Sequence, residues 1–184
     1  MTKASSVDRN FRELLARQQI HDALLRYCRG VDRLDPDIIQ SAYHPGARDN
    51  HGSFDGPVDK FIEWVMSNHA GGKVLNSVHH LGNSLITFED EKIAHGETYV
   101  SVNHRRLIDG ELFDLISHGR FIDRFEERND EWKIVDRLVV VDWDRLDRVD
   151  RQWGGPLTEK LENAQRSRED ASYRALKPGF EKSR

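Results

Sequence analysis

The sequence predicts a cone-shaped α+β barrel, in which N-terminal helices pack on a strongly curved antiparallel sheet. Two observations lead to this fold class. Apolar residues in the first third of the chain recur at helical spacing, whereas from Val74 onward long runs are rich in Val, Ile, Thr and aromatic residues. These runs are much longer than the roughly five or six residues of a typical strand, which favours a sheet that curves around the helices.

Three helices are expected before the sheet. The first covers residues 11–31 and has an apolar stripe on one side. Asp35-Pro36, a cap residue followed by proline, starts a second, short helix that runs to about Tyr43. Pro57 opens a third helix, which ends before Gly71-Gly72. The stripe of the first helix consists of Ala16, Ile20, Ala23, Leu24, Tyr27 and Val31.

Four long strands are expected at about 75–88, 93–107, 112–127 and 132–143, after a hairpin or loose strand at 47–54. Turn signals separate the four strands, so tight hairpins would join them into an antiparallel meander. These signals are Glu89-Asp90-Glu91, Asp109-Gly110 and Asn129-Asp130.

The chain of 184 residues has the length of one domain. We expect a flexible N-terminal tail at residues 1–9, a single domain at 10–143 and a charged C-terminal extension at 144–184. The extension carries few large apolar residues, so it is either a lid over the mouth of the cone or a contact between subunits. Within it, Leu157, Leu161 and Ala164 fall at the spacing of a short helix.

Composition excludes several classes of partner. The 28 basic and 32 acidic residues give a net charge of -4 and are mixed along the chain, so no broad basic face for nucleic acid is expected. The chain contains neither an apolar leader at its start nor a membrane-spanning apolar run, so no membrane partner is expected. The single cysteine, Cys28, lies in a helical pattern and cannot form an internal disulfide, which favours a cytoplasmic location.

Four residues are candidates for proton-transfer chemistry. Asp32 follows the apolar stripe of the first helix, where it either caps the helix or takes part in chemistry. His79 and His80 are adjacent on a predicted strand, so they point to opposite faces, and the alternation of the strand does not decide which one enters the interior. His104 lies among valines on the next strand and is a further candidate for an inward position.

Arg137 lies among valines on the most apolar strand. A guanidinium in such surroundings needs a partner, which is either a polar substrate group or a structural carboxylate such as Asp123 or Asp142. The nine histidines show no H-x-x-x-H or HExxH spacing on a helix, so we expect no metal site.

The order of one long helix ending near Asp32, two shorter helices and a four-stranded meander, with the segments SVHHLGN, VNHRR and EWKIVDR, resembles the nuclear transport factor 2-like superfamily. Within it, the chain is similar to the SnoaL-like and scytalone dehydratase-like branch over about residues 10–143. The resemblance places Asp32 and His79 at a paired aspartate and histidine. It places His104 at a second active-site histidine of scytalone dehydratase, and Arg137 at an arginine used by hexachlorocyclohexane dehydrochlorinase.

The resemblance to each of these enzymes is partial. Val31 stands where the dehydratase has a tyrosine, His51 lies near the position of another substrate tyrosine, and Tyr27 occupies the dehydrochlorinase's lysine position. Neither enzyme's substrate is therefore carried over to this chain. The expected substrate-binding residues are Tyr27, His51, Trp64, Asn83 and Phe121.

What the resemblance implies is a cofactor-independent lyase that acts on a small apolar, aromatic substrate. Asp32 would hold one nitrogen of His79 and leave the other as general base, while Arg137, His104, Tyr27 and Asn83 would donate to developing negative charge. The reaction would be elimination of water or another leaving group, or retro-aldol release of formaldehyde from a lignin-derived aromatic. An isomerase or a cyclase would use the same base.

Three other functions compete with this one. A hydrolase of the limonene epoxide type needs an Asp-Arg-Asp trio, which the sequence pattern does not place. The small subunit of an aromatic-ring hydroxylating dioxygenase shares this fold and size, and a module that only binds a hydrophobic ligand or a partner protein is the third alternative. Neither of the last two needs an acid–base pair. The long exposed sheet leads us to expect a homodimer or homotrimer.

Overall fold

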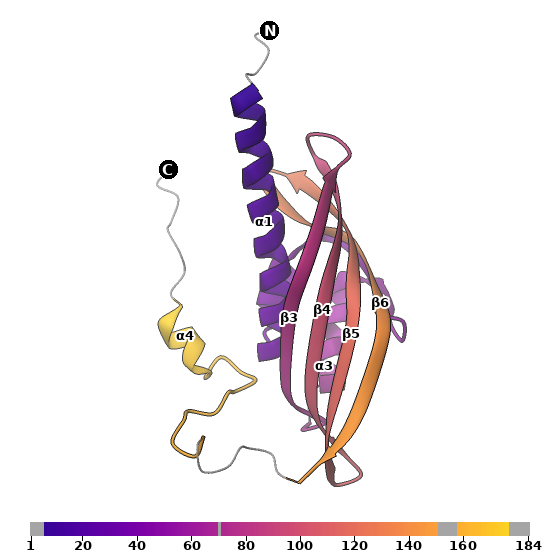
Figure 1. Ribbon diagram of the computed structural model, residues 1–184, viewed down its shortest axis with the longest axis vertical. Helices are drawn as coiled ribbons and strands as arrows, with labels where there is room; N and C mark the ends of the chain where they lie inside the picture. Colours follow the sequence, from indigo (N-terminus) through magenta and orange to yellow (C-terminus); the bar gives the residue numbers. More distant parts are fainter. Residues whose placement is uncertain (1–5, 70, 151–157, 177–184) are drawn as a thin grey trace.

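The computed structural model describes residues 6–69, 71–150 and 158–176. Helices in the first part of the chain lead into a mixed sheet, and a short helix follows it (Figure 1). The helices are α1 (Ser6–Arg33), α2 (Pro36–Ser41), α3 (Val58–His69) and α4 (Ala171–Ala175), and the strands are β1 (Tyr43–Asn50), β2 (Asp55–Pro57), β3 (Val74–Phe88), β4 (Ile93–Ile108), β5 (Glu111–Arg128) and β6 (Glu131–Val149). None of the helices in the described ranges has both the length and the apolar character needed to cross a membrane.

The sheet has the strand order β2-β1-β6-β5-β4-β3. Strands β3 to β6 form the predicted antiparallel meander, and the long strands bend together beside α1 (Figure 1). Strand β1, however, pairs with β6 in parallel, so the sheet as a whole is mixed and not antiparallel throughout. The physical reason is that the chain between β1 and β6 passes through a helix and other strands, and not through a hairpin, so the two strands are free to run in one direction.

Three parts of the chain differ from the sequence expectation. Residues 6–9 belong to α1 and not to a tail, while residues 1–5 lie outside the described part. Strand β6 continues to Val149, into the segment expected to be an extension. The expected helix around Leu161 is absent: residues 158–164 form a turn and irregular structure, and Leu161 is 63% exposed. An isolated short helix with no surface to cover its apolar side is not stable in water, which explains the difference. Leu157 lies outside the described residues.

The hydrophobic core lies between the helices and one face of the sheet. Helix α1 contributes the predicted stripe, and α3 covers the same face through Phe61 and Val65. Large side chains from the sheet fill the space between them. The fully or almost fully buried apolar residues include Ile20, Leu24, Tyr27, Ile39, Tyr43, Phe61, Phe121, Phe125 and Ile134.

A tight reversal at the end of α1 sets the position of Asp32. Leu34 adopts a left-handed backbone with φ 51°, its N–H donates to the carbonyl of Val31, and the Asp35 N–H donates to the carbonyl of Gly30. This pair of bonds is a Schellman motif. Asp35 then caps α2 by accepting from two backbone N–H groups. Because Gly30 has no Cβ, α2 packs directly against α1 at Ile39.

A bulge in β3 decides which of its side chains face the core. The register with β4 shifts between Leu81 and Ser84. Before the bulge, the residues on the core face include His79 and Leu81, and after it they include Ile86, which is buried. Regular alternation would have put Ile86 on the same face as His80. The bulge therefore explains why strand alternation alone could not choose between the two histidines.

Candidate active site

The last turn of α1 and the start of β3 bring Asp32 and His79 into contact. Nδ1 of His79 lies 2.7 Å from Oδ1 of Asp32, and the backbone N–H of His79 donates to Oδ2 at 3.0 Å. The hydroxyl of Ser77 donates to Oδ1 at 2.7 Å. The predicted hydrogen bond is thus present, with His79 on the core face and His80 exposed. Ser77, which the sequence analysis did not identify, completes the set of donors around the carboxylate.

These contacts determine the charge of Asp32 and the tautomer of His79. Burial opposes ionisation of Asp32, but the hydrogen bonds from His79 and Ser77 outweigh it, so the pKa of Asp32 is lowered. An ionised carboxylate only accepts hydrogen bonds, so the proton of the neutral imidazole is on Nδ1. The side chain of His79 is only 6% exposed. Nε2 is therefore the nitrogen left for proton transfer.

Two further histidines lie next to this pair. The ring of His104 is 6.2 Å from that of His79, and the ring of His69, at the end of α3, is 5.3 Å from His104. Burial, with a smaller effect of the nearby His79, lowers the pKa of His104 to about 3, and burial with the neighbouring Arg166 guanidinium lowers that of His69 to about 4. Both imidazoles are therefore neutral at pH 7. Within the described residues, Nε2 of His104 is buried and has no hydrogen-bond partner.

His69 and Arg166 were missed by the sequence analysis. His69 ends a helix whose pattern indicates only packing, and Arg166 lies in the charged C-terminal segment among many other charged residues. Only the return of the chain to the end of α1 brings Arg166 to His69, where its Nη2 lies 2.9 Å from Nδ1 of the imidazole. No sequence signal distinguishes this arginine from its neighbours.

Tyr27 and His51 form a second polar group in the interior. The Tyr27 hydroxyl lies 2.9 Å from Nε2 of His51, whose Nδ1 contacts the buried carboxylate of Asp49. The other oxygen of Asp49 accepts from the hydroxyl of Tyr43 at 2.5 Å. Burial raises the pKa of Tyr27 well above its usual value, and Asp49 adds to this effect, so Tyr27 remains a neutral phenol. The ring of Tyr27 is 6.1 Å from that of His79.

Arg137 has the structural partner that the sequence left open. Its Nε and Nη2 each donate to the carboxylate of Asp123 at 2.7 Å, and the two side chains are 0% and 1% exposed. Its guanidinium carbon also lies 4.2 Å from the ring centre of Tyr27 and 4.0 Å from that of Phe121. The structural alternative is therefore present, as a buried ion pair that crosses from β6 to β5, while Nη1 of Arg137 is buried with no hydrogen-bond partner among the described residues. Asp142 instead pairs with Arg120 on the surface.

An Asp-Arg-Asp arrangement does occur, contrary to the sequence pattern. Asp49, Arg137 and Asp123 are register neighbours on β1, β6 and β5. All three are almost completely buried. The acidic groups are engaged by Tyr43, by His51 and by Arg137 itself. The trio lies on neighbouring strands near the centre of the sheet, and the side chains of Asp49 and Asp123 are 0% and 1% exposed.

The remaining predicted residues divide into two groups. Phe121 is buried with its ring 5.4 Å from Tyr27, and Trp64 is partly buried with its ring 6.1 Å from Phe61. Both belong to the apolar surroundings of the interior, as do Leu81 and Val102. Asn83, by contrast, is exposed, because it lies in the bulge of β3. The expectation that it donates inside the cone is wrong.

Among the described residues, no three His, Cys, Asp or Glu side chains are grouped so that they could hold a metal ion. The row of His69, His104 and His79 is bounded by Arg166, which contacts His69, and by Asp32, which contacts His79. The Asp32 carboxylate is fully engaged by Ser77 and His79.

Comparison with known families places this site in context. Residues 12–138 match the SnoaL-like domain. The chain belongs to the SnoaL-like family. This match runs from within α1 to the first part of β6, and so it includes Asp32, His79 and His104 but not Arg166. No curated protein matches the chain.

Solved structures of the nuclear transport factor 2-like superfamily share the fold of this SnoaL-like protein. A scytalone dehydratase-like protein from Novosphingobium aromaticivorans is 17% identical, with a TM-score of 0.65 and coverage of 83% of this chain and 99% of that one. A type 2 hexachlorocyclohexane dehydrochlorinase is 14% identical, with a TM-score of 0.69 and coverage of 80% and 98%. A nuclear transport factor 2-like protein from Salmonella enterica is 17% identical, with a TM-score of 0.62 and coverage of 70% and 92%. At these identities the likeness establishes the fold alone.

Proposed function

We propose that this SnoaL-like protein is a cofactor-independent lyase that acts on a small, apolar, aromatic substrate. Its reaction would be elimination of water or another leaving group, or retro-aldol release of formaldehyde from a lignin-derived aromatic. The observation that carries the proposal is the orientation of His79 by Asp32. Two of the similar structures are named for eliminations, a dehydration and a dehydrochlorination, which is consistent with this class of reaction.

The orientation of His79 suits a general base. Asp32 holds Nδ1–H, so Nε2 can take a proton from the substrate while the carboxylate stabilises the imidazolium that forms. Such a base accelerates a reaction by roughly 10² to 10⁴. Because Ser77 and the His79 backbone hold the carboxylate, little reorganisation is needed during the transfer.

His104 suits a contact to the substrate oxygen. Its pKa of about 3 keeps it neutral, and its Nε2 has no partner among the described residues. A neutral imidazole can donate or accept one hydrogen bond without adding a charge to an apolar site. Leu81, Val102 and Trp64 provide partly buried apolar surface around these groups, which agrees with an aromatic substrate.

Two probes test the proposal: a diarylpropanediol with phenolic rings, which would release formaldehyde and water to leave a stilbene, and a phenyl-substituted β-hydroxy ketone, which would lose water to give an enone. Formation of either product by the wild-type protein, together with its loss in His79→Gln, is the expected result. His80→Gln, at the exposed neighbouring position, is the matched control and should retain the activity. Equal rates for wild type and His79→Gln, or no product from either probe, would favour a non-catalytic binding protein.

The proposed homodimer or homotrimer is a separate question, which sedimentation velocity answers. Outward-facing apolar residues such as Leu85, Tyr99 and Leu138 are exposed on the sheet, and their burial between copies would stabilise an oligomer. A monomer at micromolar concentration would overturn this expectation. A cytoplasmic location likewise stays part of the proposal.

A further inference from the structure

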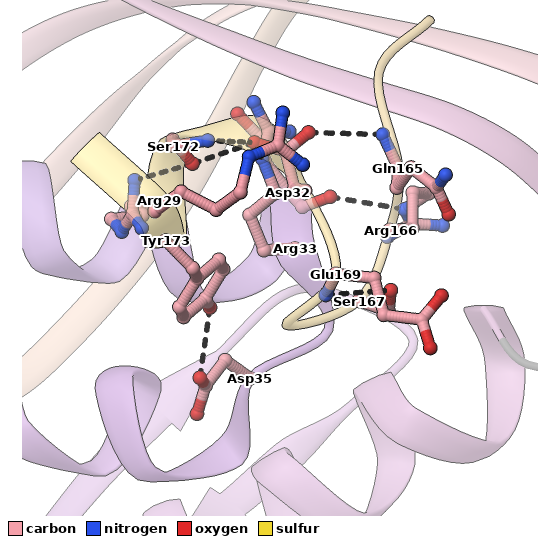
Figure 2. Close-up of polar contacts among 12 residues, drawn as sticks. Arg29, Asp32, Arg33, Asp35, Gln165, Arg166, Ser167, Glu169, Ser172 and Tyr173 are labelled. Carbon is pink, nitrogen blue, oxygen red and sulfur yellow. Dashed lines mark hydrogen bonds and ion pairs between the residues drawn. The ribbon is translucent and has the colours of Figure 1, made fainter. Parts of the chain in front are cut away.

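A C-terminal segment outside the matched SnoaL-like domain is attached to the end of α1 that carries Asp32. We call residues 158–176 the C-terminal strap. Arg168 of the strap donates twice to the carboxylate of Asp35, at 2.8 and 2.9 Å. The hydroxyl of Tyr173 donates to the same carboxylate at 2.8 Å (Figure 2). The guanidinium of Arg29 lies 4.6 Å from the ring centre of Tyr173. The strap is therefore fixed to α1 and to the start of α2.

Arg166 of the strap connects the two backbone segments that carry Asp32 and His79. Its Nε donates to the carbonyl of Asp32 at 3.2 Å (Figure 2). Its Nη2 donates to the carbonyl of Val31 at 2.9 Å. Its Nη1 donates to the carbonyl of Val74 at 2.9 Å. Val31 and Asp32 lie in the last turn of α1, whereas Val74 is the first residue of β3. One guanidinium thus joins the end of the helix to the start of the strand.

These bonds satisfy groups that the fold itself leaves open. The last carbonyls of a helix have no partner within the helix, and the Schellman motif at Leu34 engages only those of Gly30 and Val31. Arg166 supplies the donor for the carbonyl of Asp32. A planar guanidinium with five N–H donors can reach several carbonyls at once, whereas the compact ammonium of lysine cannot span the same distances in a fixed geometry.

The guanidinium of Arg166 also determines the tautomer of His69. Because a guanidinium has no acceptor, Nδ1 of His69 must accept the hydrogen bond from Arg166, and the proton of the imidazole is on Nε2. His69, the first ring of the row that continues through His104 to His79, is therefore hydrogen-bonded to a residue of the strap.

We propose that Arg166 is a positioning residue: by joining the backbone of Asp32 to the start of β3, it holds the Asp32 carboxylate and the His79 imidazole in hydrogen-bond contact. The inference rests on the proposed function only for its effect on catalysis. Arg166 contacts neither reacting atoms nor the carboxylate of Asp32, and it acts through the backbone. The end of α1 and the start of β3 are thus joined in two ways. Ser77 and His79 bond to the side chain of Asp32, and Arg166 bonds to the carbonyls of Asp32 and Val74.

The test reads the contact directly, without a substrate. In protein labelled with ¹⁵N-histidine, the Nδ1–H of His79 should give a far-downfield proton resonance, because this proton is hydrogen-bonded to a carboxylate. The resonance is assigned to His79 by its absence from the spectrum of His79→Gln. Arg166→Met removes the guanidinium and keeps the length of the side chain. We expect this resonance to be lost or to move upfield in Arg166→Met, and to be partly restored in Arg166→Lys.

Arg174→Met is the matched control. Arg174 lies in the same strap, but its guanidinium pairs with Glu162, also in the strap, at 2.7 and 2.8 Å. This variant removes an arginine without touching α1 or β3, so the resonance should stay at its wild-type position. An unchanged resonance in folded Arg166→Met would overturn the inference. If Arg166→Met does not fold, as judged by thermal melting, an unchanged resonance in Arg166→Lys would overturn it in the same way.

Kinetics separate this inference from the proposed function. With a substrate that wild type turns over, Arg166→Met should lower kcat by ~10- to 100-fold with little change in KM, since a small displacement of a base from the proton that it removes has effects of this size. An altered resonance in a protein that turns over neither probe would leave the positioning role intact and would count against the lyase. Wild-type kcat in Arg166→Met, with turnover established, would overturn the positioning role alone.

Discussion

The Nδ1 atom of His79 lies 2.7 Å from a carboxylate oxygen of Asp32, although the two residues are 47 positions apart in the chain. The carboxylate comes from the last turn of a helix and the imidazole from the start of a strand on the edge of the sheet. Their contact therefore depends on how the helix end is fixed against the strand.

Asp32→Asn tests the role of the carboxylate in holding the tautomer of His79. An amide at this position can donate as well as accept, so the Nδ1–H tautomer loses its preference and Nε2 ceases to be the reliable acceptor. We expect turnover to fall by up to about 10⁴-fold, as in other aspartate-oriented histidines, with a smaller loss in ligand affinity. Thermal melting controls for folding. Ser77→Ala, which removes one donor to the carboxylate, should have a much smaller effect; equal effects of the two variants would contradict this account.

Arg137→Leu is expected to act on stability. The variant leaves the carboxylate of Asp123 buried without its partner, and breaking a buried ion pair from one side typically costs about 3–5 kcal/mol. Urea unfolding measures this loss. The double variant Arg137→Leu/Asp123→Leu removes both charges and should be more stable than Arg137→Leu alone. A normal free energy of unfolding with strongly impaired turnover would instead support a direct role toward the substrate.

The buried histidines predict a loss of stability in acid. His69 and His104 have folded-state pKa values of about 4 and about 3, below the ordinary value near 6.5 that they take when unfolded. Between these values the unfolded chain binds more protons, so the free energy of unfolding decreases as the pH falls from about 6.5 towards 4. His104→Asn should reduce this slope by up to about 1.4 kcal/mol per pH unit. Urea unfolding at several pH values checks it, and an unchanged slope would contradict the burial of His104 in its neutral form.

Gly30→Ala should destabilise the protein, although alanine is the better helix former. A Cβ at this position would lie 2.6 Å from the backbone nitrogen of Ile39, so α2 would have to move away from α1. Such overpacking typically costs about 1–3 kcal/mol, which exceeds the roughly 1 kcal/mol gained from helix propensity. The urea midpoint of the variant shows whether its free energy of unfolding falls or rises. A more stable variant would show that α2 can move away from α1 at little energetic cost.

The sequence by itself determined the parts of this protein that depend on local pattern. The apolar stripe from Ala16 to Val31 specified α1, and the turn signals at residues 109–110 and 129–130 specified the hairpins between the long strands. The resemblance of short segments also assigned Asp32 and His79 to one pair. These features are predictable because helix and strand periods, and the conformations of turn residues, are properties of neighbouring residues.

The tertiary structure alone decided the rest. The bulge between Leu81 and Ser84 set the inward side of β3, because a single extra residue reverses the alternation and has no clear sequence signature. The partner of Arg137 depended on the register of β5 with β6, and the arrival of Arg166 at the end of α1 depended on the return of a charged segment across more than a hundred residues of chain. Contacts of this kind form only when distant segments of the chain pack together, so no local sequence pattern predicts them.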